Sequence, residues 1–238
     1  MGYEFDWSVV SQYGSWIVTG VELTILVSIV SMALSMVWAL VVAYLRMSRV
    51  RPVRTIAAFY IAVVRAIPTL VFILWAYYGV TVVTGINIPP VQAGILVLTV
   101  QYAGWLAEVY RSGIQAVDKG QAEAAHATGM SPIQTFLTVT GPQAWRIILP
   151  AMGNMFIAML KDSSLISVIG VGELMRETEL AVSLTFRPFE LYTVASLIYI
   201  VLTLGLSRVV AALESRYRTD ALGKRRFKTL PTPMPTAA

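Results

Sequence analysis

The sequence predicts an all-α membrane protein, a helical bundle with five spans. Of its 238 residues, 57% are hydrophobic and 13% are charged, whereas soluble domains carry about 25% charged residues. Two intervals, 23–45 and 66–107, contain no Asp, Glu, Lys or Arg, and about 20 apolar helical residues suffice to cross the hydrocarbon of a bilayer. Most Lys and Arg residues flank the apolar segments, as topology in a membrane requires.

The first three spans follow from these intervals. The first, about 17–44, comes after an acidic segment, 1–15, that lacks the basic start and the cleavage pattern of a signal peptide. The second, about 56–78, and the third, about 92–110, share the longer interval, which a pair of prolines interrupts. The membrane domain that begins here is expected to extend over 16–212.

The last two spans, about 150–170 and about 190–211, are separated by an acidic connector. Five spans place the two termini on opposite sides, and the excess of Lys and Arg assigns the sides. The connector after the first span and the tail, 213–238, are basic and are therefore expected in the cytoplasm. The acidic amino terminus is expected outside, and the long connector 111–149 inside, where a cytoplasmic partner can bind. The end of the tail is proline-rich and is assigned no function.

Several classes of function are disfavoured. The chain has no cysteine and one histidine, His126, which argues against a disulfide scaffold, a thiol nucleophile, and a zinc or haem site. It contains no glycine-rich phosphate loop and no metalloprotease motif. No cofactor is therefore expected in this chain. The net charge of +5 is explained by membrane topology, so binding of nucleic acid is not expected.

The cytoplasmic connector is expected to contain two short helices. Residues 121–128 favour a helix that Gly129 ends, and Ser131-Pro132 begins a second one. Small residues along the first helix allow close approach of another protein. The alternative is an amphipathic hairpin that packs on its own bundle.

Here the sequence resembles a known family. Glu123, Ala124 and Ala125, followed by Gly129 and Pro142, resemble the E-A-A signature of permease subunits of bacterial ATP-binding cassette importers. Four blocks resemble the polar amino acid branch of that family, which includes histidine, glutamine and arginine permeases: RAIPTL at 65–70, EVYRSGIQAVDKGQAEAA from 108, GPQAWRIILPAMGN to 154, and KDSSLISVIGVGEL from 161. Because the blocks share one order and spacing over about 15–212, the resemblance is specific.

The resemblance implies the fold of a type I importer permease with a cytoplasmic coupling helix, in the bacterial inner membrane. It implies a second permease subunit, identical or paralogous, a dimer of cytoplasmic ATPase subunits that bind ATP and Mg²⁺, and an external solute-binding protein that delivers an amino acid. The chain itself is then no enzyme. The residues implied in coupling to the ATPase are Gly120, Glu123, Ala124, Ala125, Gly129 and Pro142.

Two details of this signature carry alternatives. Glu123, if it lies in the first turn of its helix, can stabilise that terminus instead of contacting a partner. Gly141 stands where the family signature has Leu, which predicts that the preceding helix ends earlier.

Three charged residues, Arg65, Lys161 and Asp162, are expected near the middle of the membrane, roughly 15–17 Å along their helices. An ionised side chain there costs at least about 3 kcal/mol, so these groups are expected to face one another or a wet cavity. Asp162 suits the ammonium of an amino acid, and Arg65 or Lys161 suits its carboxylate. The alternative is a structural ion pair between the second and fourth spans.

Neighbouring residues complete the predicted substrate path. Met155 precedes Asp162 by two helical turns and shares its face, which favours neutral, apolar or acidic substrates over arginine-like ones. Ser163 and Ser164 either line the path or bond back to their own helix. Pro68 predicts a kink that frees backbone carbonyls. The full predicted set is Asp162, Lys161, Arg65, Ser163, Ser164, Met155 and Asn154.

Two rival functions are open. A self-powered, ion-coupled carrier or channel also places charges in the membrane, although five spans without repeated halves argue against the usual carrier plan. An intramembrane enzyme needs a second acid near Asp162 or a serine with a base, and neither is found. Glu108 and Arg111, three residues apart, are expected to form an interfacial salt pair.

Overall fold

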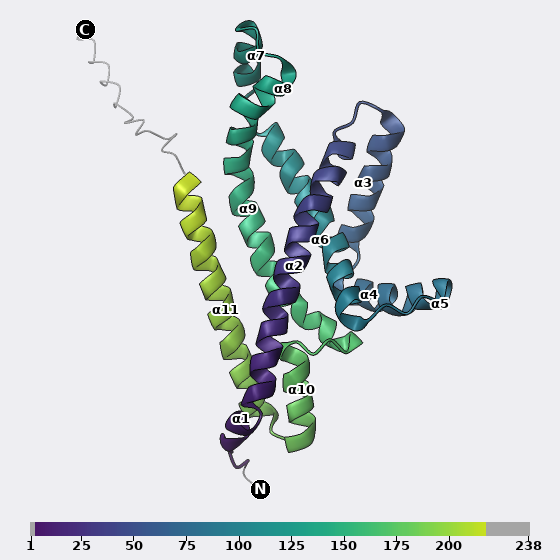
Figure 1. Ribbon diagram of the computed structural model, residues 1–238, viewed down its shortest axis with the longest axis vertical. Helices are drawn as coiled ribbons and strands as arrows, with labels where there is room; N and C mark the ends of the chain where they lie inside the picture. The colour runs from purple at the N-terminus through teal and green to yellow at the C-terminus, as the bar shows by residue number, and fades with distance from the viewer. Residues whose placement is uncertain (1–2, 218–238) are drawn as a thin grey trace, which may run out of the picture.

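The computed structural model describes residues 3–217, and no strand occurs in this part of the chain. Figure 1 shows an elongated bundle in which the long helices run side by side. In order, the helices are α1 Ser8–Gln12, α2 Gly14–Arg46, α3 Arg51–Ala66, α4 Thr69–Leu74, α5 Val80–Thr84, α6 Pro90–Gln115, α7 Lys119–Ala127, α8 Pro132–Thr135, α9 Gly141–Asp162, α10 Leu174–Thr185 and α11 Pro188–Tyr217. Part of the predicted tail, 218–238, lies outside the described residues.

Short π-helical and 3₁₀ segments continue some of these helices. The π-helical turns Trp75–Gly79 and Phe136–Thr140 join α4 to α5 and α8 to α9, and the 3₁₀ segment Ser163–Ile169 follows α9. The run Pro132–Ile169 is therefore one continuous helical rod. The helix begins well before the span predicted at about 150–170 and passes through Pro150. A proline inside a membrane helix is tolerated where neighbours satisfy the freed carbonyl.

Within the described residues, four helical runs are long and apolar enough to cross a membrane: α2, α6, Pro132–Ile169 and α11. A fifth is broken, because α3 and the stretch Thr69–Thr84 meet at an angle of 109°. The predicted five-span bundle is confirmed in this form, and the second span is broken at Pro68, where the sequence predicted a kink. We call Thr69–Thr84 the lateral arm, since it leaves the bundle sideways in Figure 1.

The break follows from Pro68. The residue before it, Ile67, is extended, with φ −85° and ψ 127°, because the proline ring excludes the helical conformation there. Pro68 has no N–H to donate to the carbonyl of Val64. Gln101 on α6 replaces that donor, because its Nε2 lies 3.5 Å from the Val64 oxygen and 3.1 Å from the Ile67 oxygen. A neighbouring helix thus satisfies the freed carbonyl.

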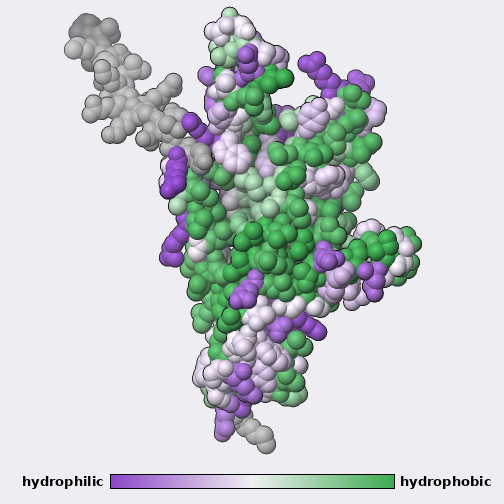
Figure 2. All heavy atoms as spheres, in the orientation of Figure 1, coloured by the Kyte–Doolittle hydropathy of each residue, from purple (hydrophilic) through white to green (hydrophobic). Residues whose placement is uncertain are grey.

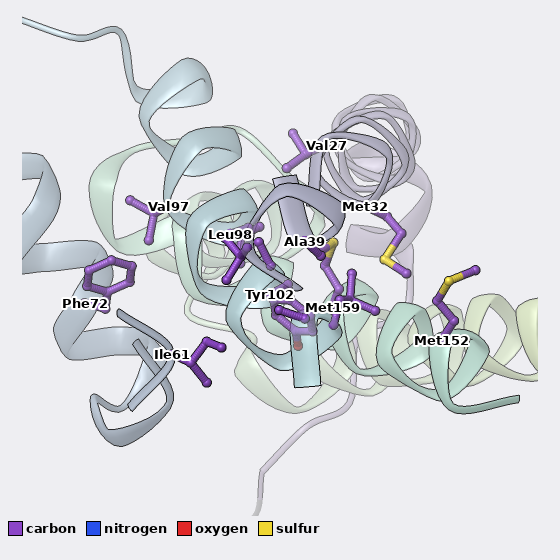
Figure 3. Close-up of a cluster of buried hydrophobic side chains, with 14 of the residues drawn as sticks. Val27, Met32, Ala39, Ile61, Phe72, Val97, Leu98, Tyr102, Met152 and Met159 are labelled. Carbon is purple, nitrogen blue, oxygen red and sulfur yellow. The ribbon is translucent and has the colours of Figure 1, made fainter. Parts of the chain in front are cut away.

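α6 forms the centre of the bundle, and small side chains bring its neighbours close. A Cβ on Gly104 would lie 2.3 Å from Val64 Cγ2 on α3, and one on Gly113 would lie 2.3 Å from Ile148 on α9. Close helix contacts of this kind replace the hydrophobic driving force that is absent between helices in lipid. Figure 3 shows the resulting core, with side chains from α2, α3, α4, α6 and α9 meeting around Leu98.

The outer surface fits a bilayer. In Figure 2, apolar side chains cover most of the visible face between the two ends, where polar side chains gather. The connector between α2 and α3, which carries Arg49, lies toward the same end as α7 and α8 (Figure 1), whereas the chain begins at the other end.

The acidic connector before α11 contains a helix that the sequence did not predict. Glu173 begins α10 by accepting hydrogen bonds from the N–H groups of Met175 and Arg176, and the Tyr199 hydroxyl of α11 donates to it at 3.0 Å. The N–H of Leu174 donates to Thr24 Oγ1 on α2. Burial outweighs these donors and raises the pKa of Glu173 to about 7. α10 is therefore fixed to both α2 and α11.

Candidate functional site

A cavity of about 390 Å³ lies where the break of the second span faces α6 and α9. Its walls come from residues 65–69, from the middle of α6, and from the end of α9. The helices bring polar groups into an otherwise apolar environment here, which is the composition of a small-molecule site.

Asp162 provides the carboxylate of this cavity. Tyr102 on α6 donates its hydroxyl to Asp162 Oδ2 at 3.0 Å, and Thr69 at the start of α4 donates to the same oxygen at 3.3 Å. Within the described residues, Asp162 Oδ1 has no hydrogen-bond donor. One oxygen thus fixes the carboxylate, and the other can accept bonds from a ligand.

Arg65 provides the cation. It lies in the last turn of α3, and its guanidinium carbon is 4.3 Å from the ring centroid of Trp105. Stacking of this kind stabilises an arginine while leaving its N–H groups free to bind an anion. The predicted alternative of an ion pair between Asp162 and Arg65 or Lys161 is not found among residues 3–217. Both charges therefore line one cavity without neutralising each other directly.

The remaining predicted residues divide into two groups. Met155 lines the cavity with Arg65 and Asp162. The other four do not line it. Lys161 and Asn154 are exposed. The two serines bond back to their own helix: the Ser163 hydroxyl donates to the Leu160 carbonyl and the Ser164 hydroxyl to the Lys161 carbonyl, both at 2.8 Å.

Sequence reasoning missed the wall that α6 contributes. Gln101, Tyr102 and Trp105 all line the cavity, and Thr69 does so beside the predicted kink. A signal was present, because a glutamine in the middle of a charge-free span has to find polar partners. Only the fold shows that these partners are the broken second span and Asp162.

The two connector helices form a projecting knob, residues 119–135, at one end of the bundle (Figure 1). Asp118 caps α7 by accepting from the N–H of Gly120 at 2.7 Å. Gly129 has φ +86°, a conformation that glycine adopts without strain. Ser131 and Gln134 form a reciprocal capping box at the start of α8. These local contacts make the knob a defined unit rather than a flexible linker.

Four of the six predicted coupling residues, Gly120, Glu123, Ala124 and Gly129, are exposed on the knob, whereas Pro142 lies in α9. Ala125 is buried against the knob itself. α7 begins at Lys119, so Glu123 lies beyond the first turn. The alternative role of Glu123 in stabilising its own helix terminus is therefore not supported.

His126 is exposed, and its Nδ1 lies 3.1 Å from the Met130 carbonyl. Glu108 and Arg111, near the carboxyl end of α6, form the expected pair at 2.7 Å.

The helix does not end before Gly141, so that prediction is wrong. The N–H of Gly141 bonds to the carbonyl of Phe136, five residues earlier, which widens the helix by one residue instead of ending it. A Cβ at position 141 would lie 2.6 Å from that carbonyl oxygen. Glycine at 141 thus permits the π turn that links the knob to α9.

Replacing Gly141 by Ala is expected to force this turn out of its π path, since the methyl group has no room. Converting a π turn to α geometry rotates the preceding segment by about 100° and shifts it by about 1.5 Å, so the knob moves relative to α9. Because the chain has no native cysteine, spin labels on cysteines placed at Lys119 and Ile147 can measure this movement as a changed distance distribution.

The control is Gly205→Ala, since no atom lies within 4 Å of a Cβ at that position in α11. The control should leave the distance between the labels unchanged. The same distances in Gly141→Ala as in the unsubstituted chain would show that the π turn does not depend on glycine.

Within residues 3–217, no group of three or more His, Cys, Asp or Glu residues could hold a metal ion. The cavity has a carboxylate and a guanidinium, and the hydroxyls of Thr69 and Tyr102 both donate to the carboxylate. Two opposite charges in one cavity can bind a small zwitterion.

Comparison with known proteins agrees with this geometry. Residues 35–219 match the family model of the binding-protein-dependent transport system inner membrane component. The chain is 36% identical over 193 residues to the probable glutamine ABC transporter permease protein GlnM of Bacillus subtilis, covering 81% of this chain and 89% of that protein. It is 33% identical over 211 residues to the histidine/lysine/arginine/ornithine transport system permease protein HisQ of Salmonella typhimurium, covering 84% and 92%.

Solved structures show the same fold. A chain from the crystal structure of an amino acid ABC transporter with histidines superposes with a TM-score of 0.85 at 37% identity, covering 90% of this chain and 100% of that one. A chain of the MetNI methionine ABC transporter in an inward facing conformation superposes with a TM-score of 0.73 at 21% identity, covering 86% and 97%. The chain therefore belongs to the family of binding-protein-dependent transport system inner membrane components, as a membrane-spanning permease subunit of an ATP-binding cassette importer and not as an enzyme.

Proposed function

We propose that this chain forms the translocation path for an amino acid or an amino-acid-like solute, and that a cytoplasmic ATPase drives transport through the knob. The observation that carries the proposal is the cavity in which Asp162, with one open carboxylate oxygen, and the stacked guanidinium of Arg65 both lie. Permeases named for glutamine and for histidine, lysine, arginine and ornithine among the relatives support the same class of solute.

The two charges match the two ends of an amino acid. Asp162 binds the α-ammonium and Arg65 binds the α-carboxylate, because each charge then gains a partner of opposite sign in a medium of low polarity. The solute's side chain then faces Met155 and Ala158, which are apolar. This wall favours neutral or apolar side chains over arginine-like ones.

The lateral arm supports a second permease subunit, identical or paralogous, as a neighbour. Val82 and Val83 near its end are 84% and 85% exposed, and Trp75 is 66% exposed. Lipid covers part of such a surface, but α5 at the end of the arm projects beyond the bundle (Figure 1), whereas α4 packs against α6 and Ser163–Ile169. A second subunit that packs against it closes the cavity from the side.

The remaining partners follow from the topology. The basic connector at Arg49 and the knob share one end of the bundle (Figure 1), which the positive-inside rule assigns to the cytoplasm. The amino terminus is then outside, where a solute-binding protein docks. Two ATPase subunits, which bind ATP and Mg²⁺, contact the exposed Glu123 face of the knob. Their closure moves the knobs together and shifts the bundle between two arrangements with different solute affinity.

The test is uptake by proteoliposomes that contain this chain, its ATPase and its binding protein. The solutes are L-glutamine, L-histidine, L-arginine and L-glutamate. We expect uptake of at least one of them with ATP and none with a non-hydrolysable analogue, and L-glutamine should exceed L-arginine because of the apolar wall. Uptake by this chain alone under an ion gradient, without ATP, would instead establish the self-powered carrier.

A further inference from the structure

Gln101 holds both sides of the break in the second span. It lies in the middle of α6 and is only 3% exposed. Its Nε2 donates to the carbonyls of Val64 and Ile67, at 3.5 and 3.1 Å. Because both partners are acceptors, the amide can take only one orientation, with Nε2 toward the break and Oε1 away from it.

That orientation leaves Oε1 without a partner. Among the buried side-chain nitrogen and oxygen atoms of the described residues, only Gln101 Oε1 lacks a hydrogen bond. A buried acceptor without a donor is destabilising and requires an explanation. Gln101 lines the same cavity as Asp162, so a ligand in that cavity could supply the missing donor.

The segment 67–69 is thus contacted by two side chains that each retain an acceptor without a donor. Gln101 binds the carbonyl of Ile67, and Asp162 binds the side chain of Thr69, two residues later. Asp162 Oδ1 and Gln101 Oε1 are the atoms left over. A primary ammonium has three N–H donors, so one carboxylate oxygen cannot satisfy it alone in a site that excludes water.

We propose that Gln101 is a further solute-binding residue, whose Oε1 accepts a hydrogen bond from the α-ammonium that Asp162 also binds. This proposal rests on the function proposed above. Oε1 is enclosed in this conformation. A displacement of Ile67 and Pro68, at the cost of the 3.3 Å hydrogen bond from the Ile67 N–H to the Val63 carbonyl, brings it to the cavity. The site then selects solutes with a primary amine and rejects those whose nitrogen is dialkylated.

The experiment is a mutant cycle on the permease with its ATPase, reconstituted in nanodiscs. Binding is measured for L-glutamine, L-histidine and L-arginine, and for the α-N,N-dimethyl derivative of each one that binds. In Gln101→Met, the affinity for the primary amine should fall by about tenfold or more, because one hydrogen bond to a charged group is lost. The affinity for the dimethyl derivative should hardly change, so the preference for the primary amine collapses.

Two further variants separate binding from folding. Gln92→Met is the matched control, because Gln92 is exposed on the same helix; it should keep the wild-type preference. Gln101→Glu retains an acceptor of the same length and should keep the preference even if the break is disturbed. If Gln101 has only a structural role, Gln101→Met will lower the affinities for the primary amine and for its dimethyl derivative by the same factor. That outcome would overturn the proposal.

The outcomes also separate the two levels of inference. If the wild-type complex binds none of the three amino acids, and the uptake test above also finds no transport of any of its four solutes, the proposed function fails and this proposal fails with it. If L-glutamate alone is taken up, the same comparison with its α-N,N-dimethyl derivative decides the role of Gln101. If the wild-type complex binds an amino acid and Gln101→Met keeps its preference for the primary amine, only the assignment of Gln101 is wrong.

Discussion

Replacing Asp162 by Asn is expected to reduce ATP-dependent uptake by about 100-fold or more while the chain still inserts and assembles. The amide oxygen of Asn can accept the bonds from Tyr102 and Thr69, so the walls of the cavity are retained. The negative charge opposite the solute's ammonium is lost, and an unpaired charge in such a site costs about 3 kcal/mol or more. Uptake and equilibrium binding, measured on the reconstituted importer, check the two parts of this expectation.

The matched control is Asp6→Asn. Asp6 is also an acidic residue that accepts from a nearby hydroxyl, that of Ser8, but it lies in the first residues of the chain, far from the cavity in sequence and fold. This variant should transport normally. Normal solute affinity in Asp162→Asn would remove Asp162 from the binding site and leave its bonds to Tyr102 and Thr69 with a structural role alone.

The second large effect is expected at the knob. Gly129→Trp places a bulky side chain beside the exposed face of α7, and Glu123→Arg reverses a charge on that face. Both variants should leave solute binding intact and let the ATPase run without transport, lowering the ratio of solute moved to ATP hydrolysed by at least about tenfold. The physical reason is that a misdocked knob transmits no movement to α9. The two rates are measured in the same proteoliposomes.

Two milder substitutions distinguish docking from folding. Gly129→Ala introduces the same backbone strain at φ +86°, about 1–2 kcal/mol, without the bulk of the indole, and Glu123→Gln removes the charge without reversing it. Coupling should survive in both. If Gly129→Trp and Glu123→Arg transport as efficiently as the unsubstituted chain, the knob is not the docking element.

The sequence predicted the elements that depend on composition and missed those that depend on contacts between distant segments. The charge-free intervals located α2 and α6, and Gly129 marked the end of α7. Pro68 predicted a kink, but neither its angle of 109° nor the donor that satisfies the freed carbonyls, Gln101, could be read from the sequence. Arg65 and Asp162 were expected to face one another or a wet cavity. Both line one cavity, but their contacts are with Trp105 and Tyr102 rather than with each other.

The same distinction applies to α10 and to Gly141. α10 was overlooked because its acidic sequence resembles a loop, and what fixes it is close packing on α2, where a Cβ on Gly20 would lie 2.8 Å from Leu174 Cα. Gly141 was interpreted as a helix breaker from its identity alone. A glycine ends a helix only where its backbone turns away, and here the carbonyl of Phe136 keeps it in line.

The break in the second span has a mechanical consequence. From Thr69 to Thr84 the crosswise segment is about 24 Å long, and it is attached to the upright α3 through only two non-helical residues, Ile67 and Pro68. Such an arrangement is a lever with its pivot at the cavity. A rotation of about 10° at the pivot sweeps the far tip through about 4 Å, so a small shift in the cavity wall can change the shape of the protein at a distance several times the size of an amino acid.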